Sequence, residues 1–570
     1  MKPLRVALLT CGAAILLGRV LFTPFLFGQA PPQQAGAATA TAASAAAVTT
    51  PASPASADPK LEAGANEMRA MQAGIQAYRD EKFPAAALSF ATATAINAEA
   101  GPTAHSYAWL ARTYLHLHRV PEAEDAARKA LEADKGLANA QTAMAEVYYR
   151  EGKMAEAETV LVDLVKNKNT MARTYLALAR IHRATANYKN ARELIDIAHE
   201  YDPKDPDIDD LWLESMTTQE RIAEWKKRLA AGKYEDQDEK QSLAAEIAVV
   251  EDRKKNENRS CTLVTKLSQT EAKLDPHMMD AHEYDSYALH VKVNGVNSTL
   301  TLDTGAGGIL VSTRIAEKAK LQKIADAPIG GIGDKGSAAG YVAFADKLQI
   351  GELEFQHCYI DVVDKKRSLN GDGLIGADVF ENYLIDIDFP DQKLKLSQLP
   401  PYPDQKGEQG SLQSEGAENS NLRNRWIPPE YKDYERVFRF GHMLLLPVRL
   451  NKAPYRLFLL DTGAWDDTLT PAAAQEATNA KKLHKDSDIT VKGLSGEVKT
   501  VYSTGEVLLT FGRFQQRRAD MVAFDLSHIS DDVGTEVSGT LGFAMLYLLD
   551  IKLDYRDDLV DFQYDPNRFH

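Results

Sequence analysis

Cysteine is scarce in this sequence, with three residues among 570. No group of histidine and cysteine residues has the spacing of metal ligands, so we predict no metal and no other cofactor. Cys11 lies close to the N-terminus, and a mature chain without it would keep Cys261 and Cys358. The sequence leaves two alternatives for this pair, namely a disulfide formed outside the cytoplasm or two unpaired thiols.

Long basic runs are also missing, and the net charge is −15. Without a basic block that could follow a phosphate backbone, we predict no nucleic-acid partner. The apolar fraction of 44% is ordinary for a soluble folded protein. A chain of 570 residues is too long for one core at about 100 to 200 residues per domain, which predicts three or four units.

The first 30 residues combine a charged start, Lys2 and Arg5, with an apolar stretch that runs on to Phe27. The small residues Gly28 and Ala30 follow, as at a signal-peptide cleavage site. We therefore predict that residues 1–30 are a signal peptide and that the protein is periplasmic or secreted. The alternative is an N-terminal membrane anchor, in which case the uncleaved segment would contact a membrane. Residues 31–60, rich in Ala, Pro, Thr, Ser and Gln, predict a disordered tether.

A helical pattern repeats between residues 64 and 208. An alanine recurs at a spacing near the period of about 34 residues that is typical of one repeat class, at Ala86, Ala123, Ala157 and Ala191. A small residue precedes each of them by the same interval, at Gly74, Ala111, Ala145 and Ala179. This register resembles the tetratricopeptide repeat (TPR), in which small residues let paired helices approach each other. The resemblance implies an α-helical solenoid that binds a protein or peptide partner, and an unrelated alanine-rich helical bundle is the alternative.

Helical periodicity continues over residues 211–230 and 234–256, with many charged residues. We assign residues 209–256 to capping and connecting helices, because the last repeat of a solenoid needs a polar outer face.

Two short segments share the sequence Leu-Asp-Thr-Gly-Ala, at 302–306 and 460–464. Each follows an apolar, strand-like run, so each is predicted to hold one carboxylate on a tight glycine-containing loop at the end of a strand. The same landmarks surround both copies in the same order: a strand hairpin before the loop, a short helix after it, a glycine tract, an apolar pair ending in glycine, and a closing strand. We therefore predict two β lobes that arose by duplication, at 281–398 and 437–565, joined by an exposed linker at 399–436.

Each lobe resembles a subunit of a retropepsin-like aspartic peptidase, and the pair resembles a single-chain version of that two-subunit enzyme. The resemblance implies a multidomain fold in which all-β, bilobal acid-protease barrels follow the α-helical TPR solenoid. It implies catalytic roles for Asp303 and Asp461. Loop-bracing roles follow for Thr304, Gly305, Thr462 and Gly463. The glycine tracts resemble flaps that cover substrate, with candidates Gly330, Gly331, Ile332 and Gly333 in the first lobe and Gly493, Leu494, Ser495 and Gly496 in the second.

Two carboxylates at one site do not both ionise easily, so one proton is held between them. The ionised member takes a proton from water while the other donates to the peptide carbonyl. We therefore predict an exported aspartic endopeptidase that acts on a peptide or protein substrate. The acidic residues after the second loop, Asp466 and Asp467, are predicted to be solvated or paired with an arginine. The alternative function is a catalytically inactive scaffold that binds peptides through the TPR array and the protease-fold cleft.

Overall fold

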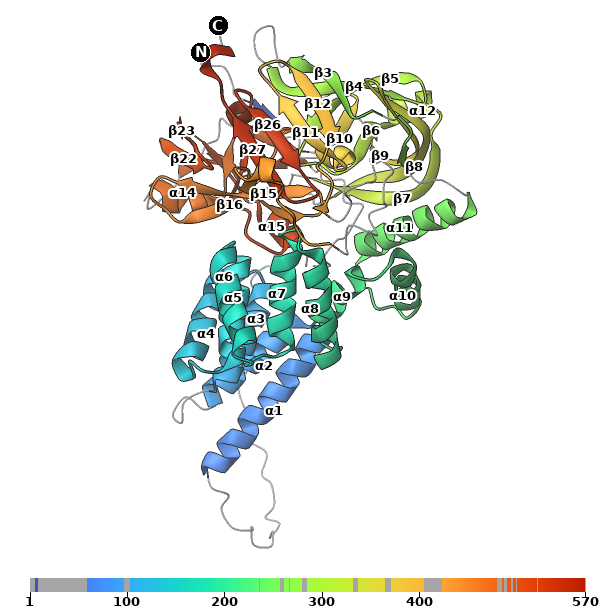
Figure 1. Ribbon diagram of the computed structural model, residues 1–570. Helices are drawn as coiled ribbons and strands as arrows, with labels where there is room; N and C mark the ends of the chain where they lie inside the picture. The colour runs from blue at the N-terminus through green and yellow to red at the C-terminus, as the bar shows by residue number, and fades with distance from the viewer. Residues whose placement is uncertain are drawn as a thin grey trace, which may run out of the picture. The chain divides into compact units, whose positions relative to one another are not determined.

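The structure is a computed structural model (Figure 1), and it describes most of the chain. The described residues are 6–8, 59–96, 103–234, 236–256, 261–265, 267–278, 284–331, 337–363, 371–403, 423–478, 484–485, 490–493, 496–498, 500–519 and 521–568. Most of the predicted signal peptide (1–30) and tether (31–60) lies outside these residues, as does 404–422 of the predicted linker. Among the described residues, no helix is long and apolar enough to cross a membrane.

The chain forms two compact units, residues 22–140 and residues 141–570 together with 1–21. The first unit contains helices that pack as consecutive pairs. They are α1 (Pro59–Arg79), α2 (Phe83–Ile96), α3 (Ala104–His116), α4 (Val120–Ala133) and the start of α5 (Ala138–Arg150). A Cβ added to Gly74 of α1 would lie 2.6 Å from Cε1 of Phe90 of α2. The small residue therefore lets these two helices approach closely.

The second unit begins with the rest of α5 and continues with further helices: α6 (Met154–Lys166), α7 (Ala172–Arg183), α8 (Tyr188–Tyr201), α9 (Pro206–Glu214), α10 (Thr218–Ala230) and α11 (Gln237–Lys255). The helical region predicted over 211–230 is divided between α9 and α10. The division falls at Thr217, whose hydroxyl accepts a hydrogen bond from the backbone N–H of Glu220, while the Glu220 carboxylate accepts one from the backbone N–H of Thr217. This reciprocal cap starts a new helix.

A β-rich region follows the helices, and its first lobe is a closed barrel. The elements are β4 (Tyr284–Val293), β5 (Val296–Asp303), β6 (Ile309–Ser312), α12 (Thr313–Lys318), β7 (Gln322–Gly330), β8 (Ser337–Ile350), β9 (Leu353–Val363), β10 (Gly373–Gly376) and η1 (Ala377–Phe380). The strands pair in the order β4-β5-β10-β6-β9-β8, and a further pairing of β4 with β8 closes the ring. Strand β10 lies between β5, to which it is parallel, and β6, to which it is antiparallel. This insertion places Gly376 beside Asp303 at the end of β5.

The second lobe repeats the plan. Its elements are β14 (Phe438–Phe440), β15 (Met443–Leu450), β16 (Tyr455–Leu460), β17 (Thr468–Leu469), α14 (Pro471–Thr478), β18 (His484–Lys485), β19 (Thr490–Gly493), β20 (Gly496–Val498), β21 (Tyr502–Ser503), β22 (Val507–Phe511), β23 (Phe514–Arg518), β24 (Val522–Ala523), α15 (Ser527–Val533), β25 (Gly539–Leu541) and α16 (Phe543–Leu546). Strand β25 is parallel to β16 and antiparallel to β17, as β10 is to β5 and β6. A short strand near the N-terminus, β1 (Val6–Leu8), pairs with β19.

A shared sheet joins the two lobes in the order β13-β27-β26-β11-β12-β3. Its strands are β3 (Gln269–Met278), β11 (Tyr383–Asp388), β12 (Lys393–Gln398), β13 (Glu435–Arg436), β26 (Asp550–Asp554) and β27 (Leu559–Gln563). The first lobe contributes β11 and the second contributes β26, which pair antiparallel. The predicted first lobe, 281–398, leaves out β3, whose proline and several charged residues are not typical of a strand.

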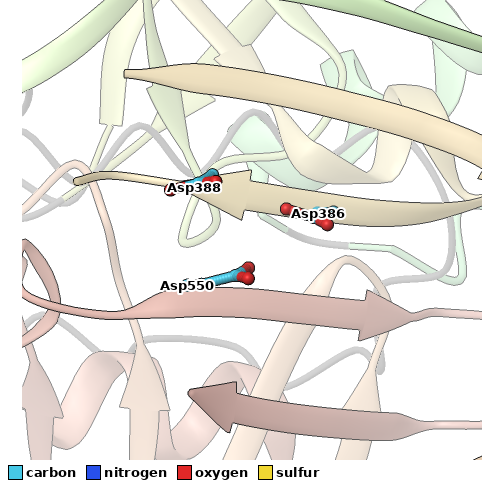
Figure 2. A group of neighbouring side chains, drawn as sticks. All are labelled: Asp386, Asp388 and Asp550. Atoms are coloured by element: carbon cyan, nitrogen blue, oxygen red, sulfur yellow. The ribbon is translucent and has the colours of Figure 1, made fainter. Parts of the chain in front are cut away.

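Three carboxylates gather where β11 meets β26, and Figure 2 shows them. Asp386, Asp388 and Asp550 each place one oxygen within 4.8 Å of the others. Lys395 lies 2.6 Å from Asp388, and Arg568 also contacts that carboxylate. Burial and the neighbouring Asp386 raise the pKa of Asp550 to about 7. The cluster therefore favours a protonated Asp550 beside an ion-paired Asp388.

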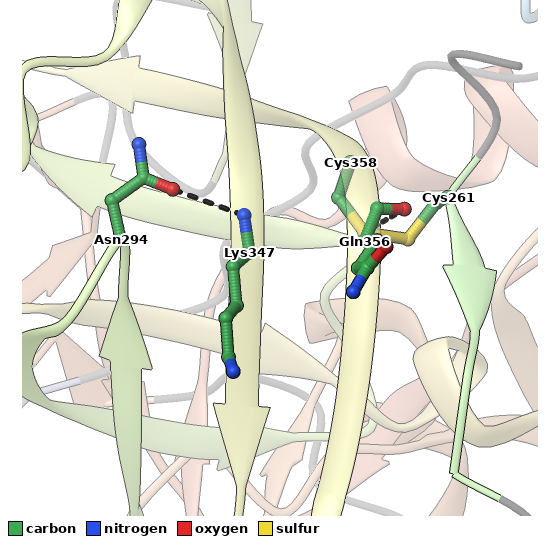
Figure 3. Close-up of a disulfide and its surroundings, with 5 residues drawn as sticks. All are labelled: Cys261, Asn294, Lys347, Gln356 and Cys358. Carbon is green, nitrogen blue, oxygen red and sulfur yellow. Dashed lines mark hydrogen bonds between the residues drawn. A yellow bond between two sulfur atoms is a disulfide. The ribbon is translucent and has the colours of Figure 1, made fainter.

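Cys261 and Cys358 form a disulfide (Figure 3). Cys261 directly precedes β2 (Thr262–Leu263), which pairs antiparallel with the part of β9 that precedes Cys358. Of the two alternatives for this pair, a disulfide or two unpaired thiols, the structure contains the disulfide. It links the chain after α11 covalently to the first lobe.

The helices of the second unit share cores with both lobes. Tyr149 of α5 and Leu161 of α6 belong to one buried cluster with Leu459 and Ala464 of the second lobe. Arg150 forms an ion pair of 2.7 Å with Asp531 of α15. In the first lobe, α11 packs on β7 and β8 through a separate buried cluster, made of Ala245, Val249, Ala327 and Val342. Residues 141–570 are therefore one compact unit, in which the helices pack on the β lobes.

Candidate active site

The two Asp-Thr-Gly loops meet through their threonines. The backbone N–H of Thr304 donates to Oγ1 of Thr462 at 3.1 Å, and the N–H of Thr462 donates to Oγ1 of Thr304 at 3.0 Å. Each hydroxyl also donates to a carbonyl of the opposite strand, Thr304 to Leu460 at 2.7 Å and Thr462 to Leu302 at 2.9 Å. These four bonds are related by an approximate twofold symmetry and hold the ends of β5 and β16 together.

The glycine of each loop lets the carboxylate of the opposite loop approach it closely. A Cβ added to Gly305 would lie 2.8 Å from Cγ of Asp461, and one added to Gly463 would lie 2.3 Å from Cγ of Asp303. Each aspartate therefore packs against the glycine of the opposite loop, where any side chain would collide with it. Both aspartates are fully buried, at 0% exposure.

Backbone N–H groups orient both carboxylates. The N–H of Gly305 donates to Oδ1 of Asp303 at 2.8 Å. In the second loop, the N–H groups of Gly463 and Ala464 donate to Oδ1 of Asp461 at 3.1 and 2.9 Å. The structure thus brings all six sequence-predicted residues of the two loops into one centre.

The first loop is held at its far end by Asp378 of η1. The backbone N–H of Gly308 lies 3.0 and 3.1 Å from the two carboxylate oxygens of Asp378. Burial raises the pKa of Asp378 to about 6, although the bond from Gly308 acts in the opposite direction. On the near side, Nε2 of His442 lies 3.2 Å from the carbonyl oxygen of Gly305.

The second loop is held by a different set of groups. The backbone N–H groups of Phe543 and Ala544 donate to the carbonyls of Ala464 and Trp465 at 2.7 and 2.9 Å. The Trp465 ring lies 6.2 Å from that of Phe543, between centroids, so it serves as packing.

Arg518 pairs with both acidic residues that follow the second loop, at 2.7 Å from Asp466 and 3.0 Å from Asp467. Burial raises the pKa of Asp467 to about 7, although Arg518 and the N–H of Gly542 act to lower it. These two aspartates directly follow the second loop, and both are ion-paired with Arg518.

The flap candidates lie partly within the described residues. Gly330 ends β7 and pairs with Ser337 at the start of β8, and Gly331 follows it. Gly493 of β19 pairs with Gly496 of β20. Both tracts thus connect antiparallel strands. Ile332, Gly333, Leu494 and Ser495 lie outside the described residues.

Sequence reasoning missed two residues that contact the first loop. Asp378 stands two positions after the glycine that ends the apolar pair of the first lobe, so an acidic residue next to that landmark was a usable signal. His442 had no local signal, because its contact with Gly305 depends on how the two lobes meet.

Part of the first lobe matches a family model. Residues 289–379 match the family model described as aspartyl protease. Together with the duplicated strand order, this match defines a β-rich domain with an aspartic-protease-like fold, preceded by a helical region.

Among solved structures, the chain is similar to the aspartic proteinase from Irpex lacteus, with 12% sequence identity and a TM-score of 0.32. That similarity covers 53% of this chain and 98% of the other. No match was found among curated proteins.

Proposed function

We propose that this protein is an aspartic endopeptidase in which Asp303 and Asp461 together activate a water molecule for peptide hydrolysis. The single observation that carries the proposal is the reciprocal bonding of Thr304 and Thr462, which sets both aspartate loops at one centre. A binding module gains little from two buried carboxylates packed against each other's loops, because their mutual repulsion costs free energy.

The chemistry follows from the shared environment of the pair. One carboxylate is ionised and accepts a proton from water, while the protonated partner donates to the carbonyl oxygen of the scissile peptide. Water adds to that carbonyl carbon, the C–N bond then breaks, and the leaving amine takes up the proton that the first carboxylate accepted from water. The proton lent to the carbonyl oxygen returns to the dyad, and no covalent bond forms between enzyme and substrate. The backbone N–H groups of Gly305 and Gly463 each hold one oxygen of the carboxylate in their own loop in place.

The flap tracts and the helices complete the proposal. The tracts at Gly330–Gly333 and Gly493–Gly496 would lie over an extended substrate and donate backbone hydrogen bonds to it. The helical pairs, read as TPR units, would recruit a protein or peptide.

We also propose that the protein is exported, to the periplasm or outside the cell. The disulfide between Cys261 and Cys358 supports this, because such bonds persist mainly in oxidising compartments. Contact with a membrane would require that the N-terminal segment remain uncleaved.

Cleavage of a mixed peptide library from acidic to neutral pH tests the function. Wild-type protein is compared with Asp303→Asn and Asp461→Asn, and with Glu506→Gln as a control in an exposed ion pair with Arg517. We expect cleavage by wild type and by the control, and none by either aspartate variant. Cleavage that survives both aspartate substitutions would refute the mechanism. If wild type cleaves nothing at any pH while all variants fold, the inactive peptide-binding scaffold becomes the better account.

A further inference from the structure

A hairpin of the second lobe reaches across to the first catalytic loop. Strands β14 and β15 pair through Phe440 and Met443, and the turn between them carries Gly441 and His442. The imidazole Nε2 of His442 lies 3.2 Å from the carbonyl oxygen of Gly305, the glycine of the first Asp-Thr-Gly loop. This contact joins a side chain of one lobe to the backbone of the loop in the other.

The hairpin is itself fixed in place by Arg439. Its guanidinium donates to the carbonyl of Tyr555 at 2.7 Å and to the carboxylate of Glu381 at 2.8 Å. Its Nε donates to the carbonyl of Gly441 at 2.7 Å, within the turn. Its backbone N–H donates to the carbonyl of Ala184, at the end of α7, at 3.0 Å. One arginine therefore ties the His442 turn to both lobes and to the helices of the same unit.

The chemistry of the contact assigns the direction of the hydrogen bond. Burial and the nearby Arg439 lower the pKa of His442 to about 4, against the opposing effect of the bond to Gly305. Above that pH the imidazole is neutral and carries one N–H. A carbonyl oxygen only accepts, so the proton sits on Nε2 and is donated to Gly305.

Gly305 is the position in this loop that most needs such a restraint. Only glycine fits there, because a Cβ would lie 2.8 Å from Cγ of Asp461. Glycine also has the widest choice of backbone angles. The N–H of the same residue donates to Oδ1 of Asp303, so a shift of the Gly305 backbone would weaken the hydrogen bond that orients this carboxylate.

We propose that His442 is a positioning residue for Asp303, acting across the lobe interface by fixing the carbonyl of Gly305. The proposal rests on the proposed peptidase function. The second loop is supported differently, since the carbonyls that follow its glycine accept from the backbone of α16. The two halves of the site therefore respond differently to changes in the hairpin.

The test compares His442→Leu, which removes the donor, with His442→Gln, which offers an amide N–H instead. His290→Gln is the matched control, because His290 is a largely exposed histidine in contact with Asp275. Steady-state cleavage by the full chain should show kcat lowered about 10- to 100-fold in His442→Leu with KM nearly unchanged. The glutamine variant should recover to within about threefold of wild type, and the control should match wild type.

Two results would overturn the proposal. One is a His442→Leu variant with the kcat of wild type. The other is equal loss in the leucine and glutamine variants together with a lower melting temperature, which would show a packing role alone.

NMR of the protein labelled with ¹⁵N-histidine separates this inference from the proposed function. If wild type cleaves no peptide, the peptidase proposal fails, and the His442 resonance decides the contact. A neutral Nε2–H tautomer from pH 5 to 8 supports the restraint on Gly305. A His442 that titrates near the ordinary value of about 6.5 overturns it.

Discussion

The two Asp-Thr-Gly loops are alike at their centre and differ in the groups that hold their flanks. Thr304 and Thr462 exchange equivalent hydrogen bonds across the interface. Apart from the threonine bonds, the first loop is held by the side chains of His442 and Asp378 and by the backbone N–H of Gly376, whereas the second is held by the backbone of α16 and by Asp467. The centre must be symmetric because two carboxylates have to meet there. The flanks only have to be rigid, so the groups that hold them can differ, and one of those that hold the first loop, His442, comes from the second lobe.

The same contrast holds for the lobes as a whole. The second lobe shares a buried core with α5, α6 and α7. The first lobe is joined to the helices through α11 and through the disulfide between Cys261 and Cys358. The two lobes thus keep the same order of central strands although different helices pack on each of them.

The threonine centre gives the largest predicted effect on stability. Thr304→Val and Thr462→Val each remove a hydroxyl that donates once and accepts once, leaving a buried carbonyl and a buried N–H without partners. We expect each variant to lose roughly 2 to 5 kcal/mol of unfolding free energy. Because the bonds are reciprocal, the two losses should agree within about 1 kcal/mol. Urea denaturation measures both, and a large loss in one variant beside none in the other would show that the centre is not symmetric.

Arg518 supports the second loop alone, so its removal should act on one side of the site. Burial raises the pKa of Asp467 to about 7, so the folded state holds a proton more tightly than the unfolded state. Stability therefore falls as the pH rises from about 4 to 7. Arg518→Met removes the opposing cation, raises this pKa further and should extend that fall to higher pH. We expect a loss of about 3 kcal/mol at pH 8 and a smaller one at pH 5.

Melting temperatures against pH measure this effect. Arg517→Met is the matched control, because Arg517 forms an exposed ion pair with Glu506. A loss that is the same at both pH values, or equal in the control, would contradict the role of Arg518.

The junction between the lobes gives the smallest effect. The pKa of Asp550 is raised to about 7 by burial and by Asp386, so Asp550 also makes the folded state less stable as pH rises from about 4 to 7. Lys552 and Lys395 lie nearby, and the former acts to lower this pKa. Asp550→Asn should stabilise the protein at pH 8 by on the order of 2 kcal/mol and change it little at pH 4. Denaturation at the two pH values checks this, with exposed Asp326→Asn as the control. A destabilised variant at pH 8 would show that Asp550 is ionised and paired.

Much of this arrangement could be predicted from local patterns. The two Leu-Asp-Thr-Gly-Ala segments, with a strand before each and an apolar pair ending in glycine after each, indicated the duplicated β lobes. The helical periodicity indicated the helices before them. Both patterns arise from local geometry, namely loops that need glycine and helices that need small residues at close approach.

What could not be predicted depends on contacts between distant segments. Strand β3 has charged residues and a proline, and it forms a strand because β4 and β12 lie on either side of it. His442 follows a glycine in an ordinary turn, and only the meeting of the lobes brings it to Gly305. The packing of α5, α6 and α7 on the second lobe could not be predicted either. The helix faces and strands that meet there are apolar, and an apolar pattern does not indicate which partner will cover it.

The kcat of peptide cleavage in Asp303→Asn, Asp461→Asn and the double variant tests most directly whether the loops form one site. If the carboxylates act as a unit, each single change should lower kcat by about 10³-fold or more, and the double variant should be no more than about tenfold slower than either. A single variant that retains the rate of wild type, or a double variant whose loss is the product of the two single losses, would contradict the account.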